Sequence, residues 1–187
     1  GGGRIDPVEL AGYFQGRIAR HDPDRRVYLR TTPERAEAEA VSARLRAKTS
    51  TRLGPLDGVP ISWKDLYDSA GTVTTGGSSL FKDRVPDRDA TVLARATRAG
   101  LVCLGKTNMT ELAFSGLGIN PTFGTPPNPF DSAVDRVPGG SSSGAAVSVA
   151  AGLAPAAIGS DTGGSVRIPA AWNGLVGLKT SFGLIPT

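Results

Sequence analysis

The chain has 187 residues, a formal net charge of +4, and 39% hydrophobic and 20% charged residues, which suffices for one sizeable core. Its one Cys and one His exclude a disulfide framework and a Cys/His zinc site. We expect a single domain spanning 1–187, with no metal and no other cofactor.

Two helix-start signals open the chain. Asp6-Pro7 places an N-cap before a proline at the first helical position, and apolar residues at helical spacing predict a helix to about Ala19. After the apolar residues 27–29, Thr32-Pro33 repeats the signal and opens an Ala/Glu/Arg-rich helix to about Lys48. We expect 1–52 to form a helical cover over the rest of the domain.

From residue 53 onwards the pattern alternates between strands and helices. Residues 59–64 alternate like a strand that places Ile61 and Trp63 on one face and Ser62 and Lys64 on the other. The further predicted elements are a helix over 90–99 capped by Asp89, a strand over 101–104, a long proline-rich loop, a helix over 141–152 and a strand over 154–159. This order is typical of the α/β class, with 53–187 as its core.

Basic residues are spread along the chain. They alternate with acidic residues in 35–39 and 84–89, and the nearest approach to a cluster is Arg25, Arg26 and Arg30. Because no aromatic residues are interleaved with them, we interpret the charge as a solvated surface rather than a nucleic-acid site. The apolar stretch 145–157 is too short to cross a bilayer, and we find no leader pattern. We expect a cytoplasmic protein that binds neither nucleic acid nor membrane, with a homodimer left open.

Two familiar motifs match in their letters only. Gly100–Thr107 fits the phosphate loop G-x-x-x-x-G-K-T, but its middle residues are predicted to be a strand and not a loop with amides facing an anion. Gly140–Gly144 fits the nucleophile elbow G-x-S-x-G, which needs a downstream His, whereas His21 lies upstream. A Ser-His-Asp triad is therefore excluded, and so is a pair of His21 with the buried Cys103. Lys106 and Lys179 are interpreted as surface lysines at element ends.

A segment dense in Gly and Ser remains, from 138 to 186. Thr162-Gly163-Gly164-Ser165 can turn successive backbone N–H groups into one concavity, where an oxyanion would bind. A serine at the end of this loop is placed to be a nucleophile. With His excluded, its base would be a lysine made neutral by burial, and Lys64 on its strand is the candidate.

Residues 53–186 resemble the amidase signature family. The resemblance is carried by residues 57–65, by 105–111, and by Gly139-Gly140-Ser141-Ser142-Ser143-Gly144 continuing through Asp161–Pro169 to Gly177-Leu178-Lys179-Thr180. One departure is Ser143-Gly144-Ala145, where many members have Gly-Gly-Ser. The resemblance implies a mixed central sheet covered by helices on both faces. Because members are usually much longer, it also implies that this chain is an N-terminal portion lacking the C-terminal part.

The resemblance also assigns roles to particular residues. It implies a Ser-cisSer-Lys triad in which Ser165 is the nucleophile, Ser141 the bridging serine after a cis peptide, and Lys64 the base. Oxyanion donors fall on the backbone of Thr162, Gly163, Gly164 and Ser165. Ser142 corresponds to a supporting serine and Asp161 to a structural carboxylate, while Arg167 corresponds to an arginine that orders the loop or faces an acidic substrate.

The implied reaction is hydrolysis of a small-molecule carboxylic amide to the acid and ammonia or an amine, through an acyl-enzyme. The alternative is a glutaminase-like component of a tRNA-dependent amidotransferase, its A chain, which would work with partner chains. The departure at 143–145 favours a stand-alone amidase. Outside the enzymes, the alternative is a catalytically silent fragment or scaffold.

Overall fold

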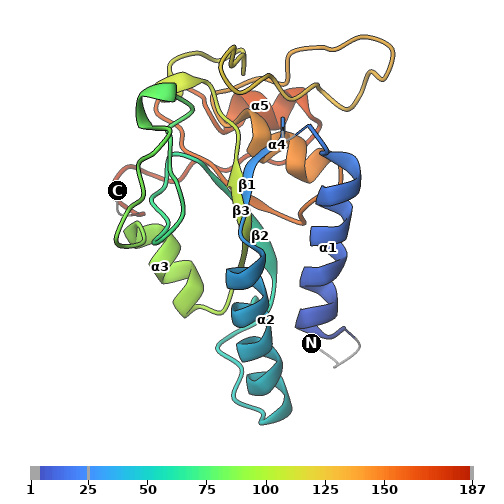
Figure 1. Ribbon diagram of the computed structural model, residues 1–187, viewed down its shortest axis with the longest axis vertical. Coiled ribbons are helices and arrows are strands. Elements are labelled where there is room, and N and C mark those ends of the chain that lie inside the picture. Colours follow the sequence, from blue (N-terminus) through green and yellow to red (C-terminus); the bar gives the residue numbers. More distant parts are fainter. Residues whose placement is uncertain (1–4, 25, 186–187) are drawn as a thin grey trace.

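A four-stranded sheet lies at the centre of the computed structural model, which describes residues 5–24 and 26–185 (Figure 1). The strand order is β1 (Tyr28–Thr31), β3 (Val102–Thr107), β2 (Pro60–Lys64) and β4 (Ala157–Ile158). β1 runs antiparallel to β3, whereas β2 is parallel to both β3 and β4. The sheet is therefore mixed, as expected. Arg25 and Pro186 lie outside the described residues.

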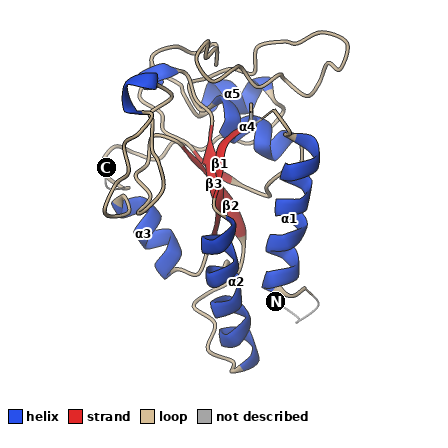
Figure 2. Ribbon diagram, viewed as in Figure 1, coloured by secondary structure: helices blue, strands red, loops and turns tan. Residues whose placement is uncertain are grey.

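Helices cover both faces of the sheet (Figure 2). On one face lie α1 (Pro7–His21), α2 (Pro33–Lys48) and α4 (Ser143–Ala150), which share two apolar clusters with Val102 and Leu104 of β3. On the other face, α3 (Thr91–Arg98) packs Leu93 against Ile61, Trp63 and Cys103. The short α5 (Arg167–Trp172) contacts α4. The predicted α/β fold is confirmed.

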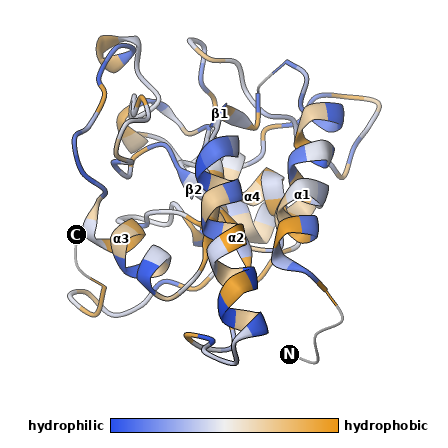
Figure 3. Cartoon of the chain, turned by 60° about the horizontal axis from the view of Figure 1, so that its bottom comes forward, coloured by the Kyte–Doolittle hydropathy of each residue, from blue (hydrophilic) through white to orange (hydrophobic). Residues whose placement is uncertain are grey.

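The local start signals place α1 and α2 correctly, although Thr32 makes no capping hydrogen bond to α2, and they misplace the cap of α3. Asp6 caps α1 by accepting hydrogen bonds from the backbone N–H groups of Val8 and Glu9. α1 and α2 pack side by side, and each carries both apolar and polar residues (Figure 3). The predicted Asp89 cap of α3 is wrong. α3 begins after Ala90, and both Asp89 oxygens accept instead from the Arg35 guanidinium at 2.7–2.8 Å. A bidentate ion pair is stronger than a capping bond.

A bulge in β3 changes which side chains share a face. Along the β2–β3 ladder, Ile61 pairs with Cys103 but Ser62 pairs with Gly105, so one extra β3 residue is accommodated there. Gly105 has φ of +154°, and a Cβ atom there would collide with the carbonyl oxygen of Arg30. β3 also runs on to Thr107, so Gly100–Thr107 forms no phosphate loop. After the bulge, Lys106 pairs with Trp63.

Lys106 is consequently not a surface residue, and that interpretation is wrong. Its side chain is fully buried, and its Nζ donates to Asp65 Oδ1 at 3.1 Å and to Thr74 Oγ1 at 2.8 Å. Asp65, equally buried, also accepts the backbone N–H and the hydroxyl of Thr75. This ion pair fastens the segment after β2 to the sheet. Lys179, by contrast, is exposed as predicted.

The last two predicted elements are shorter in the structure than in the sequence patterns. α4 begins at Ser143 rather than 141, and β4 contains two residues at the edge of the sheet rather than the six of 154–159. Across 5–24 and 26–185, no helix is long and apolar enough to cross a membrane. The same residues contain no group of three or more His, Cys, Asp or Glu side chains placed to bind a metal ion.

Candidate active site

Lys64, the last residue of β2, points away from Trp63 towards the α4 side of the sheet. The alternation of the strand explains this, because Ser62 on the same face contacts Ser148 of α4 at 2.8 Å while Trp63 packs under α3. Lys64 is fully buried, and its Nζ lies 2.6 Å from Ser141 Oγ and 2.8 Å from Ser160 Oγ. The structure thus brings together Lys64 and Ser141, 77 positions apart in the sequence.

The surroundings of Lys64 favour a neutral amine. Burial lowers the pKa of Lys64 to about 7, against the opposing effect of the negative charge on Asp161. Both direct partners of Nζ are neutral hydroxyls. At pH 7 a large share of the molecules therefore carries Lys64 as a base with a free lone pair.

Ser141 and Ser142 form the turn that leads into α4. The Gly140–Ser141 peptide is cis, and the Ser141 carbonyl accepts from Thr110 N at 3.1 Å. The next amide, Ser142 N, donates to the Ser165 carbonyl at 3.2 Å. The turn therefore holds Ser141 against Lys64 on one side and borders the loop of Ser165 on the other.

Asp161 organises the loop that precedes α5. Its nearly buried carboxylate accepts from the backbone N–H groups of Gly164, Val166 and Arg167 and from the Arg167 guanidinium at 3.0 Å. The Arg167 ion pair and these amides hold the pKa of Asp161 well below its usual range. The loop 161–167 is thus shaped around one permanently charged carboxylate.

The backbone amides of this loop divide into two groups. Gly164 N donates to Asp161 at 2.8 Å, so it is already used within the loop, contrary to the expectation that it faces an oxyanion. Thr162 N, Gly163 N and Ser165 N make no hydrogen bond to the described residues. Thr162 and Gly163 are exposed residues, and Ser165 is half-buried. Among the same residues, the Ser165 hydroxyl also has no hydrogen bond.

Ser160 is a site residue that the sequence interpretation missed. It directly follows the predicted strand 154–159 and precedes Asp161. The only available signal was this position inside the Gly- and Ser-dense segment. A hydrogen bond to a lysine 96 residues away is invisible without the fold.

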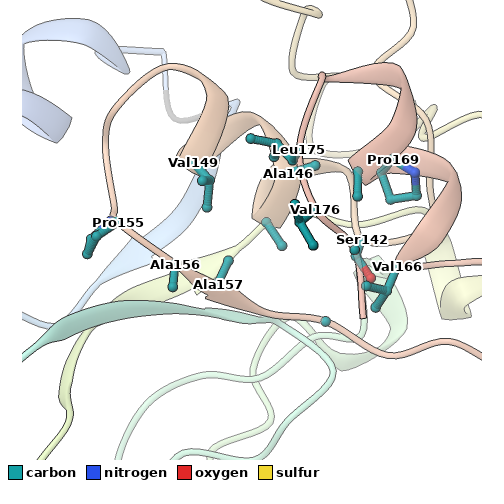
Figure 4. Close-up of a pocket in the computed structure, with 14 residues that line it drawn as sticks. Ser142, Ala146, Val149, Pro155, Ala156, Ala157, Val166, Pro169, Leu175 and Val176 are labelled. Carbon is teal, nitrogen blue, oxygen red and sulfur yellow. The ribbon is translucent and has the colours of Figure 1, made fainter. Parts of the chain in front are cut away.

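An apolar pocket of about 310 Å³ adjoins this site. Figure 4 shows Ser142 and Val166 at one end of the pocket and Pro155 at the other. Its walls come from α4, the β4 edge and the segment after α5, and small side chains such as Ala146 and Ala157 predominate. Ser142, which directly follows Ser141 in the chain, thus also lines the apolar pocket.

Ser143, part of the departure from the family pattern, is fully buried, and its hydroxyl has no hydrogen-bond partner among the described residues. Because an unsatisfied buried hydroxyl is costly, Ser143→Ala is expected to raise the free energy of unfolding by about 1 kcal/mol in urea titrations. Ser148→Ala is the matched control, since Ser148 is equally buried but hydrogen-bonded to Ser62 and Ala145, and it should lower stability. A loss of stability in Ser143→Ala would contradict the prediction.

Solved structures of amidases share this fold. A peptide amidase from Stenotrophomonas maltophilia matches with a TM-score of 0.83 and 37% identity, over 91% of this chain and 36% of that one. A bacterial aryl acylamidase described as an amidase signature enzyme matches with a TM-score of 0.82 and 34% identity, over 90% of this chain and 35% of that one. The mixed sheet described above is therefore the α/β fold of amidases.

The chain belongs to the amidase family, whose model matches residues 9–187. It is also similar to curated proteins named as the A subunit of glutamyl-tRNA(Gln) amidotransferase. The one from Ralstonia nicotianae is 45% identical, over 97% of this chain and 36% of the relative, and the one from Symbiobacterium thermophilum is 44% identical, over 98% and 37%. The chain thus spans little more than a third of the length of these relatives.

Proposed function

We propose that this chain carries the catalytic residues of an amidase that hydrolyses a carboxylic amide through an acyl-enzyme on Ser165. The observation that carries the proposal is the buried contact of 2.6 Å between Lys64 Nζ and Ser141 Oγ, with a Lys64 pKa of about 7. A lysine that is neutral near pH 7 is a competent general base, and a serine needs such a base to act as a nucleophile.

The proposed proton path runs through Ser141. Ser165 Oγ forms a bond to the amide carbonyl carbon while its proton passes to Ser141 Oγ, and the proton of Ser141 passes to Lys64 Nζ. When the tetrahedral intermediate collapses, the C–N bond breaks and the same proton returns through Ser141 to the leaving nitrogen, which departs as ammonia or an amine. Water then repeats the sequence and releases the acid, which leaves Ser165 free.

The oxyanion of the intermediate needs fixed donors at the place where charge develops. We assign that role to the amides of Thr162, Gly163 and Ser165, because Gly164 N is engaged by Asp161. Asp161 and Arg167 act in support, since their ion pair and the three backbone bonds to Asp161 fix the loop before substrate binds. Ser142 joins the loop to the Ser141 turn through its bond to the Ser165 carbonyl.

A second candidate function is that of the glutaminase-like A chain of a tRNA-dependent amidotransferase, in which the amide would be glutamine and ammonia would pass to partner chains. The 45% sequence identity to a relative bearing that name favours it. Ser143-Gly144-Ala145 and the likeness to a peptide amidase support the stand-alone amidase, which we place first. Both candidates share the same chemistry at Ser165.

The experiment that tests the shared chemistry needs no substrate. The chain is treated with a fluorophosphonate probe, and adducts are located by intact mass and peptide mapping. We expect a single adduct on Ser165, absent from Ser165→Ala and Lys64→Met. Because only neutral Lys64 can accept the proton, the labelling rate should rise with pH and reach half its plateau near pH 7.

The outcomes separate the three functions. A chain that is folded but unlabelled at every pH would support the catalytically silent scaffold and refute the amidase. If Ser165 is labelled, hydroxamate formation in the presence of hydroxylamine distinguishes the two enzymes. Turnover of simple amides and peptide amides by the chain alone favours the stand-alone amidase, whereas turnover of glutamine only after addition of partner chains favours the amidotransferase.

A further inference from the structure

Lys64 Nζ has two hydroxyl partners, and the proposed chemistry uses only one of them. A neutral amine has one lone pair, which accepts, and two N–H bonds, which donate. If Ser141 gives its proton to Lys64, the lone pair must point at Ser141 Oγ, 2.6 Å away. Ser160 Oγ, at 2.8 Å, can then serve Lys64 only as an acceptor of an N–H bond.

Ser160 is held in place by its neighbours. Ser142 Oγ donates to the Ser160 carbonyl and accepts from Ser160 N, both at 3.3 Å. One residue earlier, the Tyr67 hydroxyl donates to the Gly159 carbonyl at 2.7 Å. A Cβ atom on Gly159 would lie 2.6 Å from Ser142 Oγ, so the close approach of Ser142 to this turn requires glycine. The hydroxyl of Ser160 is therefore an acceptor fixed before the reaction begins.

The charged groups around Lys64 do not replace this acceptor. Asp161, the carboxylate whose charge acts on Lys64, is bound by Arg167 and three backbone amides. Asp65, the next residue in the chain, is paired with Lys106. The hydroxyl of Tyr67 is directed to Gly159. Within 5–24 and 26–185, the hydrogen bonds of Lys64 Nζ go to Ser141 and Ser160 alone.

We propose that Ser160 is a positioning residue: by accepting one N–H of Lys64 it aims the amine lone pair at Ser141. The inference rests on the proposed function, because it assigns a task to Ser160 within the same proton path. Ser142 contributes indirectly, because its hydroxyl holds both the carbonyl and the backbone N–H of Ser160.

The test compares fluorophosphonate labelling of Ser165 as a function of pH in the wild type, Ser160→Ala, Ser160→Thr and Ser42→Ala. Ser160→Ala should lower the plateau rate about tenfold, as loss of one hydrogen bond that orients the base would. It should also move the midpoint to lower pH by about one unit, because the lost hydroxyl stabilises the ammonium form more than the amine. Ser160→Thr keeps a hydroxyl and should restore both. Ser42, an exposed serine of α2 bonded to Ala38, is the control and should match the wild type.

Direct titration of the Lys64 side-chain nitrogen by NMR, with Lys64→Met for assignment, measures the same midpoint without the probe. A Ser160→Ala protein with unchanged plateau and unchanged midpoint would overturn the positioning role while leaving the amidase proposal intact. A lower plateau with an unchanged midpoint that threonine does not restore would mean a structural effect and would overturn it as well. An unlabelled wild type would instead refute the proposed function itself.

Discussion

Lys64→Met is expected to abolish labelling of Ser165 and, at the same time, to make the folded chain more stable at pH 7. The labelling rate should fall at least about a thousandfold, because the serine loses the base that we propose for it. The free energy of unfolding should rise by about 2 kcal/mol, because methionine fills the space of the lysine without an amine that must be desolvated. A single replacement would thus separate function from stability.

The sign and size of this change in the free energy of unfolding follow from the pKa of Lys64 in the unfolded and in the folded state. Its pKa is 10.5 in the unfolded chain and about 7 in the folded one, so between these values the unfolded state binds more protons and wild-type stability rises with pH. At pH 7 the shift costs the folded state about 4 kcal/mol. Methionine removes that cost but leaves Ser141 and Ser160 without their amine partner, at about 1 kcal/mol each.

Urea titrations of both proteins between pH 7 and pH 9 provide the measurement. The advantage of Lys64→Met should shrink by about 2 kcal/mol over that range, because folding of the wild type must release the proton of Lys64 and this release costs less free energy as the pH rises. The difference between the two proteins cancels titration of all other groups. An advantage that stays constant with pH would show that Lys64 is not the titrating group.

The second large effect is expected at the buried pair of Lys106 and Asp65. Asp65→Asn should lower the free energy of unfolding by about 3 kcal/mol or more, because it leaves a buried ammonium without its counter-charge. Lys106→Met should have a similar cost, since among the described residues the carboxylate then retains only the two donors of Thr75. Both changes preserve side-chain size, so the loss reports charge and not a cavity.

A double-mutant cycle in urea isolates the pair. Asp65→Asn with Lys106→Met should cost less than the sum of the single changes by at least about 2 kcal/mol, since neither charge remains. The matched control is Asp87→Asn, which removes a partner of Arg88 in an ion pair of 3.5 Å whose side chains are both 86% exposed, and it should change stability by less than about 0.5 kcal/mol. Additive losses at Asp65 and Lys106 would contradict the coupling.

Periodicity and end signals predicted most of the elements, because they report local chemistry. The alternation in 59–64 was enough to place Lys64 on the face opposite Trp63, and Asp6-Pro7 marked the start of α1. The pairing of Lys64 with Ser141 was predicted from the resemblance of the segments around these two residues to the amidase signature family. Spacing alone carries no information about a contact across 77 residues.

Features that depend on tertiary partners could not be predicted. Lys106 appeared to be a surface residue because the predicted strand ended at Leu104, whereas β3 continues through the bulge at Gly105 and pairs Lys106 with Trp63 in the core. Asp89 has the sequence position of a helix cap, but its carboxylate forms a bidentate ion pair with Arg35 of α2. Gly164 was predicted to be an oxyanion donor because glycines allow a loop to turn its amides in one direction. The sequence does not show that the Gly164 amide donates its hydrogen bond to the Asp161 carboxylate instead.

The bonds of Lys64 to Ser141 and Ser160 also have a consequence for the order of folding. They span 77 and 96 positions, so β2, the α4 turn and the segment after β4 must all have assembled before the amine has both partners. Closing such long loops costs entropy that short-range helix formation does not, so these contacts belong to a slow, non-local stage. Reactivity of Ser165 towards the probe would therefore appear later than helix formation in α1 and α2 during refolding from urea. The time at which it appears would report when these distant segments have assembled.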